Sequence, residues 1–260
     1  MNRDSLGDRM KGYESISKTY LMKRTPVIIR LDGKAFHTFT RGLIKPFDKI
    51  MVNTMIDTTY DLCRNIQGCV FGYTQSDEIT LVLCDYQTLD TAAWFEYQVQ
   101  KMCSVAASMC TMYFNKNFRY WVDHFKSTMT DTASNRKYLE VLQSKLDKAM
   151  FDARCFNIPK EEVTNCVLWR QNDATRNSIQ SLGQFYFSHK ELQHKSCDEI
   201  QEMLFTQRGI NWNNLATNLK RGTAVVKRYK MDSNGWEIDR EMPILKGEDR
   251  EYIENLINFE

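Results

Sequence analysis

The strongest constraint on the fold is the order in which strand-like and helix-like segments follow one another in the first 158 residues. The strand-like runs are apolar and β-rich, whereas the helix-like segments place apolar residues three and four positions apart. In chain order the segments are 25–33 (strand), 47–66 (helix), 68–74 and 78–84 (a hairpin), 88–118 (one long helix) and 149–159 (strand). The order β-α-β-β-α-β predicts an α+β fold of the ferredoxin-like type, with an antiparallel sheet and helices on one face.

The residues after Pro159 predict a helical appendage with a small hairpin. The stretch 160–188 is a long helix candidate. Ser196, with Glu199 three residues later, is typical of a capping box that opens a further helix. Residues 223–239 predict a hairpin with its Asn-Gly pair at the turn.

A chain of 260 residues suffices for one large domain or two small ones. We divide it at the change of pattern after residue 158. Residues 1–158 form the catalytic-looking region and 159–260 the appendage. We expect the two parts to share one core.

Composition and charge exclude several classes of protein. Apolar residues make up 42% of the chain, but no run approaches the roughly 18 apolar residues of a membrane span, so we expect no membrane partner. The first residues match neither a secretory signal nor a transit peptide, which predicts a cytoplasmic protein. Eight cysteines without any CxxC pair predict free thiols in a reducing compartment rather than a zinc site.

Three acidic residues fall at two strand ends that the predicted topology brings together. Asp32 ends the first strand, and Asp77 and Glu78 lie in the hairpin between the second and third strands. Acids are also common in turns, and each of them alone would be explained in that way. Converging carboxylates repel one another unless a cation intervenes, and hard oxygen ligands suit Mg²⁺. Two such ions would serve a phosphoryl displacement.

The loop after the first strand predicts a phosphate cradle. Residues 32–42 offer consecutive backbone N–H groups just beyond a strand end, with Lys34 or Lys45 as a point charge. Gly33 lets the backbone approach a ligand, and its carbonyl is a candidate metal ligand. His37 is equally well explained as a structural histidine or as a ligand contact.

Three motifs together resemble the tRNA-His guanylyltransferase superfamily: RLDGKAFHTF, YTQSDEITLVL and WRQNDATRNSI. The resemblance extends over most of the chain and is greatest to the guanylyltransferase-like branch, the template-dependent 3′-to-5′ RNA polymerases. It implies a ferredoxin-like polymerase palm that holds two Mg²⁺ ions. The guanylyltransferases proper carry His-Ile-Asn-Asn after Trp-Arg-Gln, whereas this chain has Thr175 at the position of the histidine. That departure favours an enzyme of tRNA repair.

The resemblance also assigns roles to residues. It implies Asp32, the Gly33 carbonyl and Asp77 as metal ligands, and Asp32, Asp77 and Glu78 as the catalytic residues, with Glu78 supporting the site. The implied nucleotide-binding residues are Asp32, Gly33, Lys34, Ala35, Phe36, His37, Lys45, Ser76, Asp77, Asp173, Arg176 and Asn177.

The implied reaction adds nucleotides to the 5′ end of truncated tRNA after activation of that end with ATP or GTP. The implied partners are therefore tRNA, ATP, GTP and other nucleoside triphosphates, and relatives of this kind assemble as homotetramers. Two other enzymes remain as alternatives: a tRNA-His guanylyltransferase proper, and a nucleotide cyclase of the GGDEF type, which the segment GYTQSDE resembles. A non-catalytic RNA-binding protein is a third, because ferredoxin-like sheets often bind RNA.

Two basic stretches are candidates for RNA contact. Residues 220–230 hold five basic residues and no acid, which suits a phosphate backbone but also a solvated strand face. The second stretch contains Arg136, Lys137, Lys145 and Lys148, and it is diluted by Glu140 and Asp147. The sequence favours the first.

Overall fold

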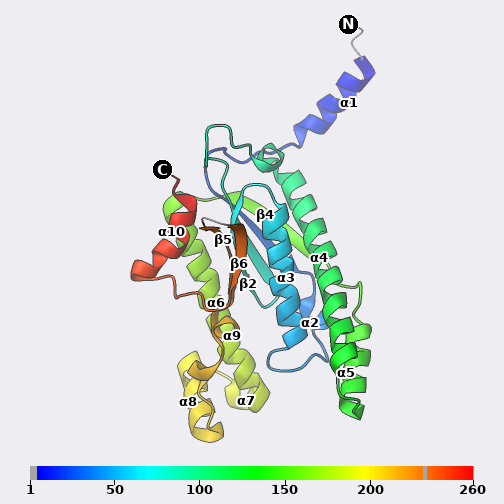
Figure 1. Ribbon diagram of the computed structural model, residues 1–260, viewed down its shortest axis with the longest axis vertical. Coiled ribbons are helices and arrows are strands. Elements are labelled where there is room, and N and C mark those ends of the chain that lie inside the picture. The colour runs from blue at the N-terminus through cyan, green and yellow to red at the C-terminus, as the bar shows by residue number, and fades with distance from the viewer. Residues whose placement is uncertain (1–4, 231–232, 260) are drawn as a thin grey trace.

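A six-stranded antiparallel sheet forms the centre of the protein, a computed structural model of which describes residues 5–230 and 233–259 (Figure 1). The strand order is β4-β1-β3-β2-β5-β6. The strands are β1 (Val27–Gly33), β2 (Cys69–Gln75), β3 (Glu78–Leu83), β4 (Phe151–Asn157), β5 (Thr223–Lys230) and β6 (Ser233–Asp239). The first four strands lie in the order of a ferredoxin-like sheet, which confirms the predicted fold class.

Helices α3 (Lys49–Asn65) and α4 (Val99–Thr128) cover one face of the sheet (Figure 1). The alternation of side chains along each strand divides the sheet residues between the two faces. Ile29 and Leu81 are paired across β1 and β3, and both belong to the large cluster under α3 and α4. Burial of these apolar side chains is the main stabilisation of this layer.

Helices α6 (Lys160–Tyr186) and α10 (Glu251–Ile257) cover the opposite face. Ile28 of β1 belongs to a second buried cluster, together with Val167 of α6 and Ile253 of α10. This cluster therefore joins residues from both sides of position 158. The division of the chain into two regions stays a prediction.

The remaining helices lie around these layers. They are α1 (Ser5–Ile16), α2 (Phe36–Phe39), α5 (Ala133–Gln143), α7 (His189–Leu192), α8 (Cys197–Arg208) and α9 (Thr217–Arg221). Ser196 caps α8 through a capping box with Glu199, as the sequence predicted. Within residues 5–230 and 233–259, every helix is too short or too polar to cross a membrane.

Both predicted ends of the long helix are wrong, since α4 ends at Thr128 and not at residue 118. The long helix begins at Val99 rather than at residue 88, because Phe95, Glu96 and Tyr97 adopt left-handed backbone angles that separate a short 3-10 helix, η1 (Trp94–Tyr97), from α4. Non-glycine residues rarely adopt such angles, so nothing in the sequence marked the break.

The Asn-Gly pair does not form the hairpin turn. Asn234 and Gly235 lie within β6 and pair with Tyr229 and Arg228 of β5. The last pair of the ladder is Lys230 with Ser233, and the two residues between them lie outside the described residues. The hairpin also extends the main sheet by pairing β5 with β2, so it is not a separate element.

Candidate active site at the end of strand β1

The end of β1 and the β2–β3 turn lie side by side. The backbone N–H of Gly33 donates a hydrogen bond of 3.1 Å to the carbonyl oxygen of Asp77. The turn consists of Ser76 and Asp77, and Ser76 has a φ of 52°. Asp32 pairs with Glu78 in the β1–β3 ladder. The structure thus brings the three predicted acids together at the neighbouring ends of β1 and β3.

The carboxylates of Asp32 and Asp77 influence each other. Burial is the largest effect on Asp77 and raises its pKa, and the negative charge of Asp32 raises it further. A hydrogen bond of 3.0 Å from the Ser76 hydroxyl opposes this shift. Among the described residues, no three or more His, Cys, Asp or Glu side chains are grouped so that they could hold a metal ion, and the metal-binding roles of Asp32 and Asp77 stay predictions.

Glu78 is committed to two arginines. Its Oε1 accepts a bond of 2.6 Å from Arg170 Nε, and its Oε2 accepts one of 3.2 Å from Arg30 Nη2. Both guanidinium groups also lie near the ring of Trp169, which is 53% exposed. The geometry gives Glu78 a supporting position beside the two aspartates, and its predicted catalytic role stays a prediction.

Three predicted residues of α6 form one network. Asp173 accepts hydrogen bonds from Arg170 at 2.7 Å and from Asn177 at 3.3 Å, and it forms an ion pair with Arg176. Asp173 is therefore compensated by two arginines. Arg176 remains largely exposed beyond this pair.

The loop from β1 into α2 is fixed by backbone contacts and aromatic packing. The N–H of Lys34 donates to the Met150 carbonyl at 2.9 Å, so this predicted phosphate donor is engaged within the protein. Ala35 has a φ of 56° and turns the chain into α2. A side chain at Gly33 would meet the Phe36 ring at 2.3 Å, so only glycine fits here. His37 is exposed and contacts the hydroxyl of Thr38.

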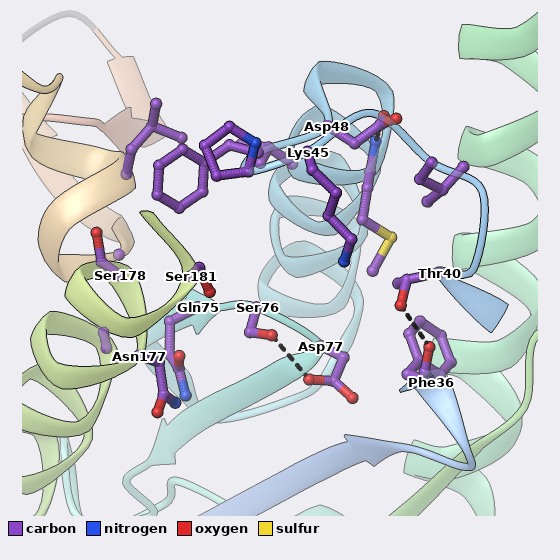
Figure 2. Close-up of a pocket in the computed structure, with 18 of the residues that line it drawn as sticks. Phe36, Thr40, Lys45, Asp48, Gln75, Ser76, Asp77, Asn177, Ser178 and Ser181 are labelled. Atoms are coloured by element: carbon purple, nitrogen blue, oxygen red, sulfur yellow. Dashed lines mark hydrogen bonds between the residues drawn. The ribbon is translucent and has the colours of Figure 1, made fainter. Parts of the chain in front are cut away.

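A cavity of about 410 Å³ opens beside the β2–β3 turn (Figure 2). Its walls come from that turn, the segment between α2 and α3, helix α6 and the segment around α9. Six predicted site residues line it: Phe36, His37, Lys45, Ser76, Asp77 and Asn177. Figure 2 shows the Lys45 side chain pointing into the cavity toward Asp77. The lining does not include Asp32, Gly33, Lys34, Ala35, Asp173 or Arg176.

Sequence reasoning missed part of this lining. Further polar groups come from Gln75, Ser178, Ser181 and Asn218, and apolar ones from residues such as Phe47 and Met51. Ser181 follows Asn177 by four residues on α6, which was the available signal, whereas Ser178 is its immediate neighbour in the sequence. Asn218 gave no signal, because only the folded chain brings α9 to the palm.

The fold and the site define a nucleotidyltransferase built on a palm-like sheet. The family model described as Thg1, tRNAHis guanylyltransferase, matches residues 7–159. The chain belongs to this tRNAHis guanylyltransferase family.

Solved structures and curated relatives agree with this assignment. A bacterial tRNA(His) guanylyltransferase (Thg1)-like protein in complex with ATP is 39% identical, with a TM-score of 0.83 over 97% of this chain and 99% of that chain. Its counterpart in complex with GTP is 37% identical, with a TM-score of 0.77 over the same shares. A probable tRNA(His) guanylyltransferase of Dictyostelium discoideum is 26% identical over 91% of this chain and 86% of its own length. The family assignment favours the predicted transferase over the cyclase and over a non-catalytic RNA-binding protein.

Proposed function

We propose that the protein adds nucleotides in the 3′-to-5′ direction to the 5′ ends of truncated tRNAs, copying the 3′ side of the acceptor stem. The observation that carries the proposal is the juxtaposition of Asp32 and Asp77, of which Asp77 lines a cavity together with Lys45 and Asn177. The likeness to structures in complex with ATP and GTP supports a nucleotide in this cavity.

The donor set at the strand end fits Mg²⁺. Two carboxylates lie close enough for the charge of Asp32 to raise the pKa of Asp77, and such a pair favours a bound cation. Asp32, Asp77 and the Gly33 carbonyl would hold two ions, with substrate phosphates as further ligands. When bound, Mg²⁺ neutralises charge that develops on the phosphoryl oxygens.

The reaction has two phosphoryl transfers. A 5′-monophosphate oxygen of the RNA first attacks the α-phosphorus of ATP or GTP, and pyrophosphate leaves. The 3′-hydroxyl of the incoming nucleotide then attacks the activated 5′ phosphorus and expels the nucleoside monophosphate. Lys45 positions phosphate oxygens as a point charge, and the hydroxyl of Ser76 and the amide of Asn177 orient them from the walls of the cavity.

The test is extension of a 5′-labelled, 5′-truncated tRNA with ATP, the four nucleoside triphosphates and Mg²⁺. We expect products that stop at the full acceptor stem and that change when the opposing 3′ bases are changed. Absence of extension, also with a 5′-triphosphorylated RNA, would contradict the proposal. Addition confined to tRNA-His would instead identify a dedicated tRNA-His guanylyltransferase, the alternative that Thr175 disfavours.

We further propose that the enzyme acts as a cytoplasmic homotetramer. Its likeness to the tRNAHis guanylyltransferase family supports this assembly. Light scattering during size-exclusion chromatography measures the mass directly. A monomeric mass at working concentration would contradict the tetramer without affecting the proposed chemistry.

A further inference from the structure

Two of the five basic residues in the stretch that the sequence favoured for RNA contact are engaged within the protein. Lys220 is buried and donates a hydrogen bond of 2.6 Å to the carbonyl of Asn213. Arg228 forms an ion pair of 2.8 Å with Glu237 on the neighbouring strand. Cations that are already neutralised release few counterions on binding RNA, so these two contribute little affinity.

The second basic stretch has a different balance of charge. Asp147, which dilutes it in the sequence, forms an ion pair with Arg119 of α4, and Arg136 forms one with Asp131. Lys137, Lys145 and Lys148 remain, none of them with an acidic ion-pair partner within residues 5–230 and 233–259, and the charge of Lys148 acts on Lys145. In the folded chain, the acid that lies between these lysines in the sequence is paired with Arg119, so the lysines keep their positive charge.

A further cation, Arg41, joins Lys145 and Lys148 from the end of α2. The ammonium of Lys145 lies 5.6 Å from the centre of the Phe39 ring, at the end of α2 that leads into Arg41. Burial lowers the pKa of Lys145, and the charges of Lys148 and Arg41 lower it further. Arg41 too lacks an acidic ion-pair partner in the described part of the chain. The adjoining Gly42 packs against Val141 of α5, which holds the end of α2 next to the lysines.

This cluster of Arg41, Lys145 and Lys148 borders the strand-end site. Lys148 is two residues before Met150, whose carbonyl accepts the hydrogen bond from the N–H of Lys34. Lys34 in turn follows Asp32 by two residues. None of the three cations belongs to the described lining of the cavity, where Lys45 supplies the positive charge.

We propose that Arg41, Lys145 and Lys148 bind the phosphate backbone of the RNA whose 5′ end occupies the strand-end site. The inference rests on the proposed function, since it requires an RNA substrate. Unpaired surface cations that follow a phosphate backbone give affinity through counterion release, without reading the bases. The cluster thus explains how one enzyme accepts several tRNAs with different acceptor stems.

The experiment measures the dissociation constant of a 5′-truncated tRNA at a series of KCl concentrations. The double variant Lys145→Ala/Lys148→Ala removes two of the three charges, and Arg41→Ala removes the other. We expect the slope of log affinity against log salt to become shallower by about 0.7–0.9 for each phosphate that the protein no longer neutralises, about 1.5 for the double variant. The fall in affinity should be equal for tRNAs of different acceptor sequence.

The matched control is Lys11→Ala/Lys18→Ala. It removes the same charge from exposed lysines on and beside α1, at the far end of the molecule from α5 (Figure 1). An equal change of slope in this control would overturn the proposal, because net charge alone would then explain it. Circular dichroism and thermal unfolding establish that each variant is folded. The variant Lys145→Arg/Lys148→Arg should keep the wild-type slope.

The Michaelis constant for ATP separates the two possible phosphate sources. An unchanged salt slope in the double variant, with a raised ATP constant, would assign the cluster to the nucleotide and overturn the proposal. If the wild type extends truncated tRNA but the double variant binds it with the wild-type slope, only this inference fails. If the wild type neither binds nor extends tRNA, the proposed function fails, and the inference with it.

Discussion

The N–H of Gly33 donates to the carbonyl of Asp77, and this single bond joins the end of β1 to the β2–β3 turn. It fixes the backbone on which the carboxylates of Asp32 and Asp77 are carried. Burial is the largest cause of the raised pKa of Asp77, and the charge of Asp32 raises it further, so the backbone holds two carboxylates within reach of each other's charge. Such enforced repulsion is expected where a cation is to be bound.

Replacing Asp77 with asparagine should separate activity from stability. The variant Asp77→Asn keeps the shape of the side chain but loses its charge, and we expect about a 10³-fold fall in both phosphoryl transfers, several kcal/mol of transition-state stabilisation. Because folding raises the pKa of Asp77, the ionised form destabilises the native state, so the neutral amide should not lower the free energy of unfolding. Asp131→Asn is the surface control. Retained extension would remove Asp77 from the metal site.

Alanine at Gly33 should damage the fold locally. Its Cβ would lie 2.3 Å from the Phe36 ring, which itself packs against Phe114 and Phe151. Overpacking of this kind costs about 1–3 kcal/mol, which urea unfolding measures. Gly12→Ala, which meets no atom within 4 Å, is the matched control and should leave stability unchanged or slightly raised. Equal effects of both substitutions would contradict the packing argument.

Neutralising Glu78 should be strongly destabilising. The variant Glu78→Gln leaves Arg30 without its acidic partner in a largely buried site, whereas Arg170 keeps its ion pair with Asp173. Breaking a buried ion pair from one side costs about 3–5 kcal/mol, because the remaining charge is uncompensated. Arg154→Ala breaks an exposed pair and should change the free energy of unfolding by less than about 1 kcal/mol. A similar small effect at Glu78 would show that water already screens the two arginines.

The capping box of α8 should give a defined dependence of stability on pH. Hydrogen bonds from the Ser196 backbone are the largest cause that lowers the pKa of Glu199, to about 2 from an ordinary value of 4.5. The native state thus favours the carboxylate, and its contribution to stability is complete above pH 4.5 and disappears as the pH falls toward 2. Glu199→Gln should be less stable than the wild type at pH 6 and converge with it in acid, in urea unfolding. Glu202→Gln, on the same helix, should show no such convergence.

Lys45 should act on the nucleotide rather than on the fold. Its side chain points into the cavity (Figure 2), so Lys45→Ala removes a charged contact to phosphate. Such contacts contribute about 1.5–3 kcal/mol, which predicts a rise of about 10- to 100-fold in the Michaelis constant for ATP. Lys45→Arg keeps the charge and should restore part of the affinity. An unchanged Michaelis constant for ATP in both variants would show that Lys45 does not contact the phosphates of ATP.

The sequence predicted the elements whose side chains obey a simple period. The spacing of apolar residues predicted the palm strands and α3. The predicted topology then indicated that the acids at the strand ends lie close together. Long-range partners were beyond such reasoning. Neither the pairing of Asp147 with Arg119 nor the bond between Glu78 and Arg170 leaves any local trace, since each joins segments far apart in the chain. The left-handed backbone of Phe95, Glu96 and Tyr97 was not predicted either, since local sequence preference disfavours it. The register of β6, which places Asn234 and Gly235 within the strand, also departs from the local preference of this pair for a turn.

Helix α6 is one unbroken element of 27 residues, and this gives the molecule a mechanical property. Its N-terminal half is embedded in the cluster over the sheet, its middle carries Asp173 and Asn177, and its C-terminal end is packed with α8 in a separate apolar cluster. At 1.5 Å per residue the helix is about 40 Å long. A tilt of the helix axis by about 5° at Arg170 would displace Tyr186, at the C-terminal end of the helix, by about 2 Å. A displacement of the α7–α8 end would therefore reach Asp173 and Asn177, which lie nearer to Arg170, as a smaller shift.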